Sequence, residues 1–205
     1  MVDFLEDPSP APSFIAVDGE IQRIVLTGFM GAGKSTVGRL LADRVGWDFL
    51  DLDSYIETVT NKNARELFDA LGETGFRQLE TDFWASALKR SQAIIAPGGA
   101  VIDKPANQSI LANSAGSFVV FLDALFPTLI DRCLRQEREQ GATYRPLLYK
   151  TELARTRYIE RRVLYANHAH RVVNVADKSP EVIAQGIWQM VSTFSVRSVN
   201  ETYRR

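Results

Sequence analysis

Residues 28–36 read GFMGAGKST and combine three glycines with a lysine and two hydroxyl side chains. The order G-x-x-x-x-G-K-S is the spacing of a phosphate-binding loop. In such a loop the glycines turn backbone N–H groups toward phosphate oxygens, the lysine reaches the outer phosphates, and the next hydroxyl can ligate Mg²⁺. The pattern predicts a nucleotide-binding set of Gly31, Ala32, Gly33, Lys34, Ser35 and Thr36.

The segments on either side of this loop have the patterns that such a loop requires. An apolar run at residues 24–26 suits a buried parallel strand. Apolar residues then recur at helical spacing over residues 37–45, and Gly46 stands where a helix would end. A helix N-terminus placed there attracts anions through its free N–H groups and its dipole. The alternative, an ordinary glycine-rich turn, would need neither flank.

Apolar runs of strand length occur near residues 24–27, 48–52, 93–96, 117–122 and 171–175, with helical patterns between them. This alternation predicts an α/β fold with a parallel sheet covered on both faces. Ligands of such sheets bind at the carboxyl ends of the strands, so polar residues directly after a strand are candidates for the site.

The second predicted strand runs into two aspartates, Asp51 and Asp53. Residues two apart on a strand share a face, so both carboxylates could point into one site. There a carboxylate can take a proton from a substrate hydroxyl or hold a metal-bound water. Helix capping is the alternative, which we weigh evenly from spacing alone. The third predicted strand ends in Pro97, Gly98 and Gly99, which suit either a close approach to a ligand or a tight turn.

Several arginines lie in positions that could bind anions. Arg77 is three residues before Glu80, and a solvated ion pair on a helix explains this pair without any function. A break at residues 72–73 precedes it. The segment 135–148 carries Arg138 and Arg145 and suits either a lid over phosphates or a plain surface loop. In the next helical pattern Arg161 could grip a carboxylate, or could belong to a solvated basic face.

The composition limits the class of protein. The chain has 205 residues, of which 45% are hydrophobic, and this predicts one domain. A net charge of −1 argues against nucleic acid as a partner. Cys133 is the one cysteine, and no apolar run approaches the roughly 18 residues needed to span a membrane. With no basic signal at the start, we predict a cytoplasmic protein without a membrane partner. We also expect a monomer.

Taken together, the motifs resemble those of the shikimate kinase family. They are GFMGAGKST, DLDSYIE, LFDALGETGFRQLE, PGGA, RPLL and RRVLY, in this order over residues 22–193. The resemblance implies a three-layer P-loop kinase fold, with a five-stranded parallel sheet, a lid and a substrate-binding segment. It also implies the reaction, in which ATP, with Mg²⁺ as cofactor, phosphorylates the 3-hydroxyl of shikimate. The implied domain is 22–194 with a lid near 138–150, between a loose leader at 1–21 and a tail at 195–205.

The resemblance also implies roles for individual residues. Asp53 matches the base that contacts the substrate hydroxyls, and Asp51 matches an aspartate that holds Mg²⁺ through water, alongside Ser35. Lys34 and the lid arginine, Arg145, match groups on the transferring phosphate. The matches to the substrate-binding residues are Arg77 and Arg161 for the shikimate carboxylate and Gly98 and Gly99 for the ring, and Arg138 matches an arginine near adenine.

Two positions depart from the family pattern. Ala100 stands where a third glycine is usual, and Val163 where a proline often occurs. The methyl group of Ala100 could narrow the substrate pocket, whereas Val163 would change only a detail of a helix. Two alternatives therefore remain open: a small-molecule kinase of another specificity, such as a gluconate-type kinase, and a nucleotide-binding homologue without catalysis.

Overall fold

The computed structural model describes residues 20–140 and 147–202. The strands, in chain order, are β1 (Arg23–Thr27), β2 (Asp48–Asp51), β3 (Ala93–Ala96), β4 (Ser117–Asp123) and β5 (Arg171–Asn174). The helices are α1 (Lys34–Val45), α2 (Leu52–Thr60), α3 (Ala64–Ala87), the 3₁₀ helix η1 (Val101–Asp103), α4 (Pro105–Ala112), α5 (Phe126–Gln140), α6 (Thr151–Asn167) and α7 (Pro180–Thr202).

The five strands form one parallel sheet in the order β2-β3-β1-β4-β5. The predicted α/β fold and its parallel sheet are therefore confirmed, with strand ends within one residue of those expected. One difference matters for the site. β2 ends at Asp51, and α2 begins at Leu52. Asp53 consequently lies in the first turn of a helix, so strand alternation was the wrong reason for placing it beside Asp51.

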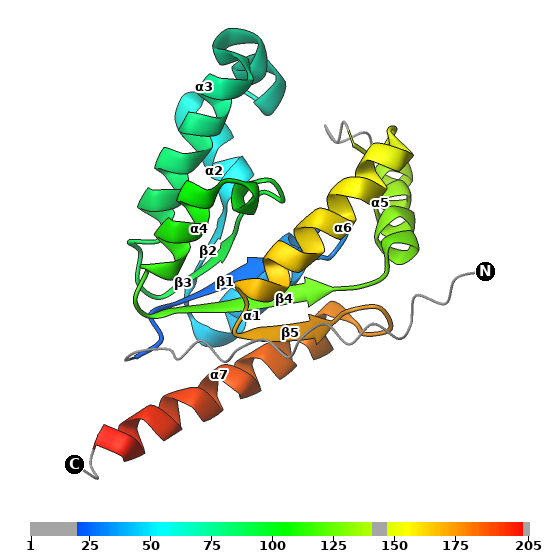
Figure 1. Ribbon diagram of the computed structural model, residues 1–205. Coiled ribbons are helices and arrows are strands. Elements are labelled where there is room, and N and C mark those ends of the chain that lie inside the picture. The colour runs from blue at the N-terminus through cyan, green and yellow to red at the C-terminus, as the bar shows by residue number, and fades with distance from the viewer. Residues whose placement is uncertain (1–19, 141–146, 203–205) are drawn as a thin grey trace.

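Helices cover both faces of the sheet, which gives three layers (Figure 1). α1 and α7 pack together on one face, and α3, α4 and α6 lie on the other. The central strands β1 and β3 are buried along their whole length, since both faces are covered. α1 ends as predicted at Gly46, which has a left-handed backbone (φ 71°).

The long helix α3 contains the break that the sequence predicted. Gly72 has φ 65° and ψ 176°, so its backbone is not helical, and two helices meet there. A capping box between Asn63 and Glu66 starts the first of them. The second begins after Gly72 and turns Phe76 into the core, with Arg77 beside it. The change of direction therefore decides where the side chain of Arg77 lies.

Some expectations from sequence concern residues outside the described part of the chain. They are the leader up to residue 19, the lid residues 141–146 with Arg145, and the last three residues of the tail. Helix α7 continues to Thr202, past residue 194, where the tail was expected to begin. Among the helices of residues 20–140 and 147–202, none has the length and apolar character to cross a membrane.

Candidate active site

The loop after β1 has the backbone geometry of a phosphate cradle. Gly28, Gly31 and Gly33 all have positive φ, at 149°, 79° and 87°. A Cβ on Gly31 would lie 2.2 Å from the carbonyl oxygen of Leu129 in α5, so only glycine fits there. Gly33 caps α1 without any side-chain hydrogen bond. The first N–H groups of α1 are thus not capped by a side chain and suit an anion.

The polar residues of this loop face the end of β2. The Nζ of Lys34 donates to the carbonyl oxygen of Gly28 at 2.8 Å, so the ammonium group lies over the loop itself. The hydroxyl of Ser35 donates to Oδ2 of Asp51 at 2.6 Å. The other oxygen of Asp51 accepts from the backbone N–H of Ser54 at 3.4 Å, as a helix cap. The capping and the metal-holding interpretations of Asp51 are therefore compatible.

Asp53 lies directly against the glycine turn after β3. A Cβ built on Gly98 would be 2.6 Å from Oδ1 of Asp53. Water reaches this side chain, yet the protein around it replaces part of its hydration. This desolvation, together with the charges of Asp51 and Glu80, raises the pKa of Asp53 to about 6, although Lys34 acts in the opposite direction. A carboxylate tuned in this way suits a proton acceptor near neutral pH.

Arg77 is held by three neighbours on its side of the site. Its Nη1 donates to Oε2 of Glu80 at 2.5 Å, and its guanidinium lies 5.6 Å from the ring centroids of both Phe68 and Phe76. Only 5% of the Glu80 side chain is exposed, so the pair is not the solvated pair that sequence favoured. Burial raises the pKa of Glu80, and the charges of Arg77, Lys104 and others oppose that shift.

Arg161 reaches the same turn from α6. Its Nη1 is 3.7 Å from the position of a Cβ on Gly99. The hydroxyl of Tyr165, one helical turn later, donates to the carbonyl oxygen of Gly99 at 2.7 Å. Burial raises the pKa of Tyr165, so the hydroxyl stays protonated and fixes the turn. Unlike exposed Arg157, Arg161 is buried, which excludes the solvated-face interpretation for Arg161.

The structure thus gathers these sequence-predicted residues at the carboxyl end of the sheet. Asp53 lies against Gly98 of the glycine turn, and Arg161 lies against the next residue, Gly99. Glu80, the partner of Arg77, lies close enough to Asp53 and to Arg161 for their charges to act on one another. The site therefore brings together the carboxylate of Asp53 and the guanidinium groups of Arg77 and Arg161.

Ala100 and Val163 do not disturb this arrangement. Ala100 has φ −89° and ψ −10°, which an alanine adopts without strain. The turn therefore needs no third glycine for backbone reasons. Val163 points outward from α6, with 57% of its surface exposed.

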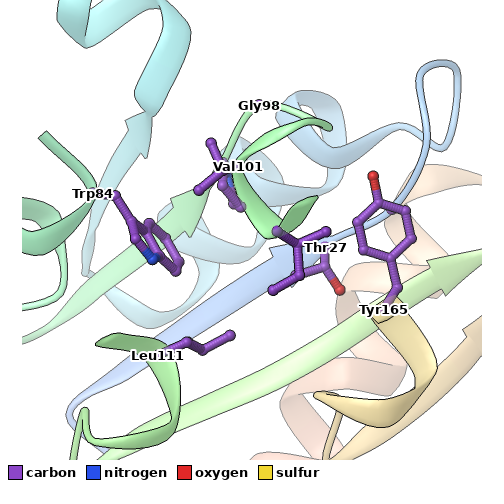
Figure 2. A pocket seen from close by; sticks show the side chains of 9 residues that line it. Thr27, Trp84, Gly98, Val101, Leu111 and Tyr165 are labelled. Atoms are coloured by element: carbon purple, nitrogen blue, oxygen red, sulfur yellow. The ribbon is translucent and has the colours of Figure 1, made fainter. Parts of the chain in front are cut away.

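An apolar pocket supports the turn from beneath (Figure 2). Thr27 at the end of β1 and Gly28 at the start of the phosphate-binding loop line it, together with Trp84 of α3 and Tyr165 of α6. Its full lining is Thr27, Gly28, Trp84, Pro97, Gly98, Val101, Ile102, Leu111 and Tyr165. No charged side chain is among these lining residues.

Two site features were missed at the sequence level. Asp103 in η1 accepts from Nε and Nη2 of Arg161, and no local pattern could have indicated it, because 58 residues separate the two. Arg132 of α5 donates to the carbonyl oxygens of Val175 and Ala176 at 2.6 and 2.8 Å, just after β5. Arg138, by contrast, is exposed on α5 and donates to its own helix at Leu134.

A parallel sheet of this order, with a phosphate-binding loop after its first strand and a carboxylate just after its second, defines a P-loop kinase. A family model described as shikimate kinase matches residues 30–192, which is most of the chain. The chain belongs to the shikimate kinase family.

Individual relatives agree with this assignment. The chain is 34% identical over 182 residues to a shikimate kinase of Synechococcus elongatus, covering 87% of this chain and 91% of that protein. It is 40% identical over 164 residues to one of Lactococcus lactis, covering 80% and 94%. Among solved structures, a shikimate kinase from Acinetobacter baumannii in complex with shikimate has a TM-score of 0.73 and 30% identity, covering 84% of this chain and 94% of that one.

Proposed function

We propose that this protein transfers the γ-phosphoryl group of ATP to the 3-hydroxyl of shikimate, giving ADP and shikimate 3-phosphate. One observation carries the proposal. Beside a phosphate-binding loop, a carboxylate, Asp53, and a buried arginine, Arg161, lie against adjacent residues of one glycine turn, Gly98 and Gly99. A polyhydroxylated acid needs both a proton acceptor for its hydroxyl and a cation for its carboxylate. The family of the chain supports the choice of acid.

The acid end of the substrate would bind between Arg77 and Arg161. Each guanidinium already has an acidic partner, which fixes its orientation and still leaves N–H donors for a carboxylate. The backbone of Gly98 and Gly99 would line the ring, because any side chain there would fill the space beside Asp53 or Tyr165.

The transfer itself would be mostly positioning and charge neutralisation. The 3-hydroxyl oxygen forms a bond to the γ-phosphorus while the bond to the β–γ bridging oxygen breaks, and the hydroxyl proton passes to Asp53. Lys34 would leave its loop carbonyls for the outer phosphates and stabilise the charge that builds there. Arg145 is proposed as the lid cation on the transferring phosphate.

The residues present fit a magnesium ion at the end of β2. Ser35 and Asp51 offer hard oxygen atoms 2.6 Å apart beside the loop, and Mg²⁺ takes few protein ligands and keeps several waters. Ser35 would bind directly and Asp51 through water. When bound, the metal neutralises phosphate charge and polarises the phosphoryl oxygens.

The remaining parts of the proposal concern the nucleotide and the setting. Gly31, Ala32, Gly33 and Thr36 would complete the phosphate contacts. We propose Arg138 near adenine, with Arg132, on the turn of α5 that packs against the loop, as a second candidate. We further propose a catalytic domain at residues 22–194 with a lid near 138–150, and a cytoplasmic monomer that works without a macromolecular partner.

A different small-molecule kinase is the alternative. A gluconokinase from Sinorhizobium meliloti matches with a TM-score of 0.55 and 18% identity, which shows the shared fold alone. Gluconate is an open-chain acid, so a gluconate-type kinase would not need Arg77 and Arg161 in this arrangement beside a ring-lining turn. A homologue without catalysis would not need Lys34 and Asp53, which are both present.

The test is a coupled ADP-release assay with shikimate, quinate and gluconate side by side, with Lys34→Ala as the blank. We expect ADP release above the blank with shikimate and a kcat/KM at least about tenfold lower with the other two, because quinate has a saturated ring with an extra hydroxyl and gluconate has no ring. Preferential turnover of gluconate would overturn the proposal. So would the absence of shikimate-dependent ADP release from a folded protein that binds ATP.

A further inference from the structure

Asp103 forms a two-pronged ion pair with Arg161 that the proposed reaction does not use. The Nε of Arg161 donates to both carboxylate oxygens at 2.9 and 3.1 Å, and Nη2 donates to Oδ2 at 2.7 Å. Only 9% of the Arg161 side chain is exposed, against 32% for Asp103. The arginine is therefore the buried partner, and its charge is compensated from one side.

The geometry leaves a second edge of the guanidinium for another anion. A guanidinium has five N–H donors on two usable edges, and Asp103 occupies the edge formed by Nε and Nη2. The other edge ends in Nη1, which faces the turn at Gly99. Asp53 lies against the neighbouring residue of this turn, Gly98.

We infer that Asp103 is a positioning residue for substrate binding: it holds Arg161 by one edge so that the other edge is presented to the carboxylate of the substrate. The inference rests on the proposed function, because it requires an acid as the substrate. Without Asp103, the buried guanidinium would lose its partner and be drawn toward Glu80, whose charge already acts on it. Glu80 would then be shared between two arginines, and the binding edge of Arg161 would turn away from Gly99.

The opposite role would give the opposite result. If Asp103 instead imitated the substrate and competed with it for Arg161, removing Asp103 would lower the KM for shikimate. The two-edge geometry argues against competition, since both carboxylates can be bound at once. The sign of the change in KM therefore decides between positioning and competition.

The experiment compares Asp103→Ala and Asp103→Asn with the wild type, with initial rates measured against shikimate and against ATP. We expect Asp103→Ala to raise the shikimate KM about tenfold, the size of one lost charge-assisted contact, with the ATP KM within about twofold. Asp103→Asn keeps one acceptor oxygen but not the charge, so it should raise the shikimate KM by less. In an Arg161→Ala background, Asp103→Ala should add no further loss of shikimate binding, because there is no guanidinium left to position.

The control is Glu160→Gln, which makes the same change of charge on the exposed ion pair with Arg157, next to Arg161 on α6. It should leave both KM values unchanged. A lower shikimate KM in Asp103→Ala, a change under twofold in both variants, or equal losses for shikimate and ATP would overturn the inference. If Asp103→Ala does not fold, Asp103→Asn alone carries the same criteria. Wild-type protein that makes no ADP with shikimate would instead refute the proposed function.

Discussion

Replacing Gly98 with alanine should move the carboxylate of Asp53 without altering any charge. The added Cβ would lie 2.6 Å from Oδ1 of Asp53 and 3.3 Å from both Cγ and Oδ2. Carbon and oxygen do not remain at 2.6 Å, so the carboxylate must retreat by about 0.8 Å to reach ordinary contact near 3.4 Å. The perturbation is therefore a displacement of the proposed base by a known amount.

The expected loss is in turnover and not in stability. A misplacement of about 1 Å at a reacting group can cost roughly 100-fold, so we expect kcat with shikimate to fall between about tenfold and 100-fold. The φ of Gly98 lies outside the left-handed region, and the contacted atom ends a flexible side chain. The Tm should stay the same or rise slightly, because alanine restricts the unfolded chain by about 0.4–1 kcal/mol.

The assay is ADP release at saturating ATP, with a thermal melt of the same sample. Ala100→Gly is the matched control in the same turn, since Ala100 already has a helical backbone (φ −89°) and its methyl group is not expected to obstruct the ring. It should change the shikimate KM by less than about threefold. The reasoning is refuted if Gly98→Ala keeps more than a third of the wild-type kcat, or if its activity falls only in step with its Tm. A tenfold fall in KM in Ala100→Gly would show that the alanine does narrow the pocket.

Three further predictions concern the charged groups. Lys34→Ala should keep the fold and reduce turnover to a few per cent or less of the wild-type value, because the described part of the loop holds no second cation for the outer phosphates. Greater residual turnover in a folded variant would exclude the role of Lys34 on these phosphates. Arg77→Ala should raise the shikimate KM by more than tenfold, since a charge-assisted contact is worth about 1.5–3 kcal/mol, and it should change ATP affinity little. Its control is Arg157→Ala, on the exposed face of α6. Equal losses of affinity for shikimate and ATP in Arg77→Ala would contradict the assignment. The pKa of Asp53 is about 6 in the folded protein against 3.8 for a free carboxyl, so kcat/KM should fall as the pH drops through about 6. The folded state then binds the proton more tightly than the unfolded state, and the contribution of Asp53 to stability falls as the pH rises from 3.8 to about 6. Asp53→Asn should therefore be inactive but have a higher Tm than the wild type at pH 7. This difference in Tm should vanish below pH 4. A lower Tm of the variant at pH 7 would show that the surroundings do not destabilise the ionised form of Asp53.

The fold class and the phosphate-binding loop could be predicted from the sequence alone, because both depend on local patterns. Short apolar runs alternating with helical spacing predict a parallel sheet, and the glycine, lysine and hydroxyl spacing predicts the loop. The break at Gly72 and the helix end at Gly46 were also predictable, since glycine tolerates the left-handed backbone seen at both. Each of these features needs only neighbouring residues.

Which charged residues act together could not be predicted, because it depends on how distant segments pack. Sequence placed Asp53 on a strand beside Asp51, yet Asp53 begins a helix and reaches the site because Gly98, 45 residues later in the chain, leaves room for its carboxylate. The pair of Arg77 and Glu80 looked solvated, yet Glu80 is buried. Charges are not periodic in the way that apolar residues are, so a single sequence cannot tell a solvated arginine from a buried one.

The partnership of Arg161 with Asp103 illustrates the limit most clearly. The two residues are 58 apart, and they meet only because parallel strands bring α6 and η1 to the same end of the sheet. Their distance, burial and shared edge decide how the arginine faces the turn at Gly99. The sequence shows that the residue types required for the chemistry are present. The orientation of their side chains follows from packing between segments that no local pattern connects.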